Sequence, residues 1–133
     1  LLGSSAAALT RYERVGARIE TESAQGAGIA FSGPALVDGK LWPFTDNATV
    51  WLPAGLHRVE PSMKAPPLRI LNFTGDIGTV RVSAGIEFTY KSSSRAIATL
   101  DRAPKHVEVD GELFSPSGTT LLLPRGQHLV TIE

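Results

Sequence analysis

The chain has 133 residues and a formal net charge of zero at pH 7. This balance, with no basic run, argues against a nucleic-acid-binding surface. No apolar run approaches the roughly 20 residues that a membrane-spanning helix needs. The absence of cysteine excludes disulfides, thiolate zinc sites and cysteine nucleophiles. With 42% hydrophobic residues, the composition is that of a folded globular protein.

Residues 1–14 contain the one helix candidate of the sequence. Ser4 and Ser5 are favourable N-cap residues for the alanine-rich run that follows them. The segment is short, so we expect either a short helix or a linker. The chain starts with Leu1 rather than Met, which suggests a piece of a longer polypeptide.

From residue 15 onward the pattern is that of short β-strands separated by turns. Residues 17–22 alternate, and after the Ser32-Gly33-Pro34 turn a repeated unit runs from Leu36 to Glu60. Residues 61–67 contain three prolines, which disfavour helices and cannot donate to a sheet, so we predict a linker there. The predicted organisation is a first β-unit at 15–62 and a second at 63–133.

The second half consists of short alternating runs with turns at regular spacing. In one of these runs Ile86, Phe88 and Tyr90 share a face, opposite Glu87 and Thr89. Many short strands with frequent turns are typical of an antiparallel sandwich. We therefore predict an all-β fold, an antiparallel β-sandwich built from two related small β-units in tandem that pack together.

The strongest sequence signal is a repeat within the chain. The stretches 37–39 and 50–59 recur as 109–111 and 121–130, sharing Val-Asp-Gly and Leu-Pro-x-Gly-x-His-x-Val. Asp-Gly favours a tight turn because glycine accepts a positive φ. Leu-Pro-x-Gly is a second turn, in which proline fixes φ and glycine relieves strain.

The polar residues that repeat with this unit are His57 with His128 and Asp38 with Asp110. The histidines are candidates for ligands or acid–base groups. A histidine placed just after a Pro-Gly turn is better explained by a structural role, in which it bonds turn carbonyls and holds a hairpin. Aspartate before glycine is turn chemistry, because its side chain caps backbone N–H groups.

Aromatic residues of the first unit are the candidate ligand-binding site: Trp42, Phe44 and Trp51. Exposed aromatic rings on a β-sandwich can stack on sugar rings. The alternative is that these residues form the core, since the counterparts of Trp42 and Trp51 in the second unit are Phe114 and Leu122.

Other polar clusters lack the context of known sites. The Ser92–Arg95 run has no nucleophile-elbow pattern, and the clusters at 45–47 and 74–76 lack the spacing of calcium loops. We expect no catalytic residue, no metal and no cofactor, and hence a protein that is not an enzyme.

The stretches 90–96, 103–111 and 123–130 resemble accessory β-sandwich modules, Ig-like or PEGA-like, of bacterial secreted or surface polysaccharide-processing enzymes. The resemblance implies a non-catalytic, C-terminal module associated with a glycoside hydrolase or similar enzyme. It implies an extracellular, periplasmic or cell-surface location. The partners it implies are the rest of a longer polypeptide and a polysaccharide.

Two functions follow as expectations. The first is an accessory module that braces or assists a carbohydrate-active enzyme and binds glycan if Trp42 is exposed beside polar groups. The alternative is a purely structural or adhesive Ig-like module that mediates domain or protein contacts, for which the tryptophans should be buried. We expect neither nucleic acid nor membrane insertion in either case.

Overall fold

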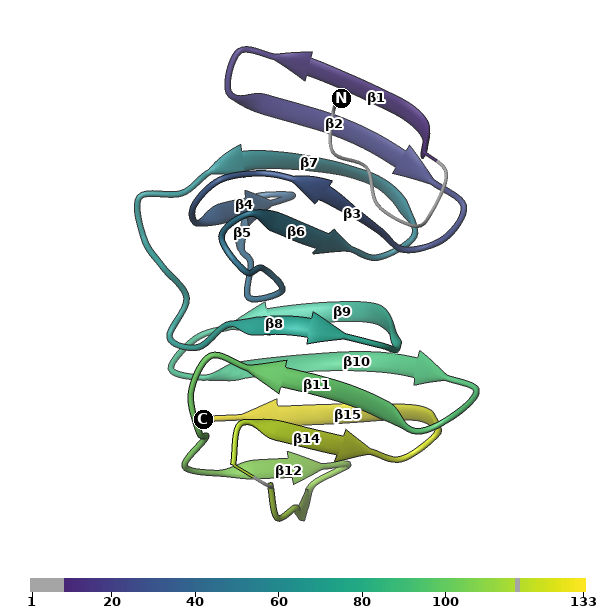
Figure 1. The fold of residues 1–133 in the computed structure, drawn as a ribbon, viewed down its shortest axis with the longest axis vertical. Helices are drawn as coiled ribbons and strands as arrows, with labels where there is room; N and C mark the ends of the chain where they lie inside the picture. Colours follow the sequence, from purple (N-terminus) through teal and green to yellow (C-terminus); the bar gives the residue numbers. More distant parts are fainter. Residues whose placement is uncertain (1–8, 117) are drawn as a thin grey trace. The chain divides into compact units, whose positions relative to one another are not determined.

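The computed structural model describes residues 9–116 and 118–133, and these contain β-strands and no helix. The chain divides into two compact units, residues 1–66 (unit 1) and 67–133 (unit 2). Each unit has two antiparallel sheets (Figure 1). The predicted all-β, sandwich-like fold is confirmed.

Unit 1 combines a five-stranded sheet of order β1-β2-β7-β4-β5 with a two-stranded sheet, β3-β6. Its strands are β1 (Leu9–Val15), β2 (Arg18–Ser23), β3 (Ala27–Ala30), β4 (Ala35–Val37), β5 (Lys40–Leu41), β6 (Thr49–Leu52) and β7 (Gly55–Pro61).

Unit 2 has a five-stranded sheet of order β13-β12-β15-β10-β9 and a three-stranded sheet of order β14-β11-β8. Its strands are β8 (Ile70–Phe73), β9 (Asp76–Val82), β10 (Ile86–Ser92), β11 (Ala96–Leu100), β12 (Val107–Val109), β13 (Glu112–Leu113), β14 (Thr120–Leu123) and β15 (Gly126–Ile132). Strands β9 to β15 correspond, one by one, to β1 to β7, because the larger sheets have equivalent strand orders. The topological repeat is therefore longer than the sequence repeat, which covers only the second half of each unit.

The core of each unit follows from period-two alternation along its strands. In β10, Ile86, Phe88 and Tyr90 are buried, whereas Lys91 is exposed. Phe73 contacts Phe88 and Tyr90 edge-on, with ring centroids 5.5 and 5.6 Å away. This edge-to-face arrangement is favoured by the aromatic quadrupole.

Two sequence-based predictions about the chain outside the repeat are wrong. Residues 9–14 are neither helix nor linker, because Leu9–Val15 pairs along β2 as an antiparallel strand. The other residues of the predicted helix, 1–8, lie outside the described part. Pro61 is not linker either, since it ends β7 opposite Ala35, a strand-end position where the missing N–H is tolerated.

The repeated turns have different roles. Asp38 and Gly39 have φ values of 52° and 80°, as a tight hairpin between β4 and β5 requires. The sequence predicts a hairpin at the Leu-Pro-x-Gly turn, but this turn does not join two strands of one sheet. It carries the chain from β6 in the smaller sheet to β7 in the larger one. The turn therefore connects the two layers of the unit.

A β-bulge in β9 gives a test of how closely β9 and β10 pack. Gly78 and Thr79 together oppose Thr89, and a Cβ on Gly78 would lie 2.4 Å from Thr89 Oγ1. That hydroxyl is held in place by the Thr79 N–H at 2.8 Å. We expect Gly78→Ala to cost about 1–3 kcal/mol in urea unfolding, because the site is overpacked. In a Thr89→Ala background the same substitution should cost clearly less, and an equal cost in both backgrounds would contradict this explanation.

Candidate functional site

The repeated aspartate and histidine meet in space in each unit. In unit 1, Asp38 lies at the β4–β5 turn and donates its backbone N–H to the Arg58 carbonyl on β7 at 2.8 Å. Its Oδ1 accepts the Arg58 N–H at 2.9 Å. The positive φ of Asp38 turns the main chain out of the sheet, so its carboxylate takes the place of a backbone carbonyl. The side chain thus extends the β4–β7 ladder by one position.

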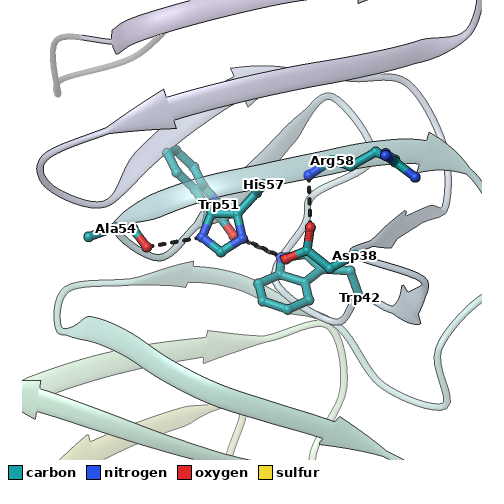
Figure 2. Close-up of polar contacts among 6 residues, drawn as sticks. All are labelled: Asp38, Trp42, Trp51, Ala54, His57 and Arg58. Carbon is teal, nitrogen blue, oxygen red and sulfur yellow. Dashed lines mark hydrogen bonds and ion pairs between the residues drawn. The ribbon is translucent and has the colours of Figure 1, made fainter.

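His57 ties this aspartate to the turn between the sheets (Figure 2). Its Nδ1 lies 2.7 Å from Asp38 Oδ2, and its Nε2 lies 3.0 Å from the Ala54 carbonyl oxygen. Ala54 is the variable residue of Leu-Pro-x-Gly. One imidazole therefore connects the Asp-Gly turn with the layer-crossing turn.

Unit 2 repeats the arrangement. His128 Nδ1 lies 2.5 Å from Asp110 Oδ2, and Nε2 lies 2.7 Å from the Arg125 carbonyl oxygen. Asp110 Oδ1 accepts the Leu129 N–H at 2.9 Å. We call these two arrangements the Asp–His clamps, consisting of Asp38, His57 and the Ala54 carbonyl in unit 1, and of Asp110, His128 and the Arg125 carbonyl in unit 2.

The clamp geometry determines what the histidines can do. In both clamps each ring nitrogen faces an oxygen that only accepts hydrogen bonds. In unit 2 the bond to Asp110 raises the pKa of His128, so the arrangement there favours an imidazolium with a proton on each nitrogen. An Asp–His pair also occurs in catalytic triads, where the second nitrogen faces a nucleophilic hydroxyl. Here a turn carbonyl occupies that place. Neither nitrogen of His128 then offers a lone pair to abstract a proton or to bind a metal, and both nitrogens of His57 are engaged by the same kinds of partner.

The pKa values of the unit 2 clamp residues are shifted in the directions that this pairing predicts. Hydrogen bonds from the Leu129 N–H and from His128 lower the pKa of Asp110. The bond to Asp110, followed by the Arg125 carbonyl, raises the pKa of His128. Beneath His128, burial and then the Asp110 charge raise the pKa of Tyr90 to about 12, and its hydroxyl donates to the Pro124 carbonyl at 2.5 Å.

The predicted ligand-binding aromatics are mostly inside unit 1. Trp42 is 4% exposed and Phe44 is fully buried, with ring centroids 5.8 Å apart. The Trp42 indole N–H donates to the Trp51 carbonyl at 2.8 Å. Trp51 is only partly buried. The exposed ring face that sugar stacking needs is therefore absent at Trp42 and Phe44.

An open groove of about 510 Å³ lies beside the unit 1 clamp and includes Glu20, Leu56 and Glu60. Glu20 Oε2 lies 3.7 Å from Arg58 Nε and 3.9 Å from Arg18 Nε. Within residues 9–116 and 118–133, no cluster of three or more acidic or histidine side chains is arranged to hold a metal ion. The described chain also has no helix that could span a membrane.

Sequence patterns identified the clamp residues but not their partnership. Asp38 and His57 are 19 residues apart, and Asp110 and His128 are 18 apart. The recurrence of both residues at nearly the same spacing is the signal that would have linked them. Asp46, in the cluster at 45–47 that lacks the spacing of a calcium loop, caps its own turn, with Oδ1 accepting the N–H groups of Ala48 and Thr49.

Comparisons with known proteins give no match: no family model fits the chain, and neither the curated proteins nor the solved structures contain a significant relative.

The stability that the unit 2 clamp contributes should decrease both at high pH and at low pH. Because folding raises the pKa of His128, its stabilisation is complete below the ordinary histidine value of about 6.5 and is lost as the pH rises through the raised value. Folding lowers the pKa of Asp110, so its contribution is complete above about 3.9 and is lost as the pH falls through the lowered value.

NMR titration of the His128 ring measures the first effect directly. We expect a pKa above the ordinary value in the native protein, and a fall toward that value in Asp110→Asn. Asparagine tolerates the positive φ and still accepts the Leu129 N–H, so the turn is retained. A His128 pKa at or below its ordinary value, or one unchanged by Asp110→Asn, would contradict the clamp.

Proposed function

We propose that the chain is a non-catalytic structural module of a larger secreted or surface protein, and that it mediates contacts between domains or proteins. The observation that carries the proposal is the clamp. The Asp–His pair, which is repeated in both units, is used to join strands, with both imidazole nitrogens engaged. In this role neither histidine has a ring nitrogen free for chemistry.

The resemblance to accessory modules of polysaccharide-processing enzymes supports the same class of function. On this proposal the module braces its neighbours rather than binding their substrate, because Trp42 and Phe44 are packed inside. The secreted or surface location rests on that resemblance alone.

Glycan binding is the second candidate, and the partial exposure of Trp51 is the observation that favours it. An aromatic ring with one accessible face can still stack on a sugar. The choice between the two functions therefore depends on one side chain.

Tryptophan fluorescence separates the two, since both tryptophans lie in unit 1. We expect blue-shifted emission that does not change during titration with a panel of soluble polysaccharides. In Trp51→Phe only Trp42 emits, and we expect this emission to be blue-shifted as well. A saturable change with one polysaccharide, absent in Trp51→Phe, would refute the structural role and establish a glycan-binding module.

A further inference from the structure

The two units differ at one sheet edge, and unit 1 shows how that edge can be closed. The Trp51 N–H on β6 donates to the Phe44 carbonyl at 2.9 Å, and the Trp51 carbonyl accepts the Trp42 indole N–H at 2.8 Å. Both backbone groups of Trp51 point away from β3 and are satisfied by the segment that follows the Asp-Gly hairpin.

The same segment closes the other outward position of β6. The Thr49 N–H donates to Asp46 Oδ1 at 2.6 Å, and its carbonyl accepts the Thr45 hydroxyl at 2.8 Å. Residues 42–46 therefore cover the outer edge of β6 completely. An uncovered edge would present free backbone donors and acceptors to other chains.

The equivalent edge of unit 2 is that of β14, where Thr120 and Leu122 occupy the places of Thr49 and Trp51. Leu122 lies opposite Ile97 on β11. The Ile97 N–H donates to Thr74 Oγ1 at 2.8 Å, and the Ile97 carbonyl accepts the Thr74 N–H at 3.1 Å. Ile97 and Leu122 are thus a non-hydrogen-bonded pair, and the backbone groups of Leu122 point away from β11.

Within residues 9–116 and 118–133, no group bonds the outward N–H and carbonyl of Thr120 or Leu122. Part of the reason lies in the sequence. Phe114 stands at the position of Trp42, and both begin the segment with a backbone bond to the preceding strand. Phenylalanine has no ring N–H with which to reach the edge strand. The β14 edge is therefore open where the β6 edge is closed.

A groove of about 420 Å³ lies beside this edge. Its lining is mixed. The apolar part includes Leu113, which is 76% exposed, and Leu122, which is 48% exposed, with Phe114 and Pro124, and the charged part consists of Arg95, Asp110 and Glu112. An open strand edge next to a groove with exposed apolar side chains is the combination that strand addition uses. The edge supplies backbone bonds, and the groove accepts alternate side chains.

We propose that β14 of unit 2 binds an extended peptide segment of a partner protein by strand addition. Unit 1 defines the chemistry of that segment: a tryptophan whose indole N–H reaches the Leu122 carbonyl, followed by a second aromatic residue whose carbonyl accepts the Leu122 N–H. This proposal rests on the contact-mediating function above and specifies its surface. A second copy of the chain is a poor donor, because its own residues 42–46 are engaged on β6 and Trp42 and Phe44 are buried there.

Amide hydrogen exchange by NMR on the whole chain tests the proposal, with the peptide Leu-Trp-Pro-Phe-Thr-Asp-Asn (residues 41–47) as the probe. Without peptide, we expect the Thr120 and Leu122 amides to exchange at least about tenfold faster than those of Thr49 and Trp51. Saturating peptide should slow Thr120 and Leu122 by about tenfold or more. Thr49 and Trp51 serve as internal controls and should not change.

Two matched changes sharpen the result. A peptide with phenylalanine in place of tryptophan lacks the indole donor and should bind about fivefold more weakly. Leu122→Lys places a charge at a half-exposed position of the edge and should abolish protection. Leu113→Asp, at a more exposed site, serves the same purpose if Leu122→Lys does not fold.

The proposal is overturned if the Thr120 and Leu122 amides are already as protected as their unit 1 counterparts, or if the peptide leaves them unchanged. It is also overturned if the peptide still protects these amides in Leu122→Lys, or in Leu113→Asp where that variant is used. If the peptide has no effect and the tryptophan fluorescence does not respond to polysaccharide, the strand-addition proposal fails but the proposed structural function is retained. A polysaccharide response at Trp51 refutes that function instead, whatever the peptide does.

Discussion

Each unit depends on a carboxylate that takes the place of a backbone carbonyl. At Asp38 and Asp110 the main chain leaves the sheet through a positive φ, and the neighbouring strand would lose a ladder bond there. The side chain restores that bond. The histidine then holds the carboxylate and, with its other nitrogen, the turn by which the chain crosses between sheets. Charge-assisted bonds of this kind are stronger than neutral ones.

The two units share topology and clamp but complete their smaller sheets differently. In unit 1 the segment after the Asp-Gly hairpin covers β6, and the indole of Trp42 provides the key donor. In unit 2 that donor is missing, and β8 instead pairs with the far side of β11. The Trp-to-Phe difference removes one of the four bonds that close the β6 edge, and the residues that make the other three also differ between the repeats.

Much of the architecture could be predicted from the sequence, and the limits have physical causes. Alternation in stretches such as 86–90 identified strands, and the Asp-Gly and Pro-Gly pairs identified turns, because these signals are local. The strand at 9–14 was missed because the Ser4-Ser5 N-cap candidates and the alanines at 6–8 just before it suggested a helix, while the observed strand is determined by pairing with β2. The pairing of Asp38 with His57 is a tertiary contact, which the repeat of both residues at nearly the same spacing in unit 2 indicates only indirectly. Whether Trp42 faced solvent could not be decided from residue type, because a tryptophan suits either place.

A double-mutant cycle on Asp38 and His57 tests the central claim that the clamp couples the two turns. Tryptophan fluorescence follows urea unfolding of unit 1 selectively, since unit 2 has no tryptophan. Asp38→Gly removes the carboxylate without straining the positive φ, and His57→Ala removes the imidazole. We expect a coupling free energy of about 1 kcal/mol or more, within the range for residues in one hydrogen-bond network. Additive effects of the two substitutions would contradict the clamp and the structural role assigned to it.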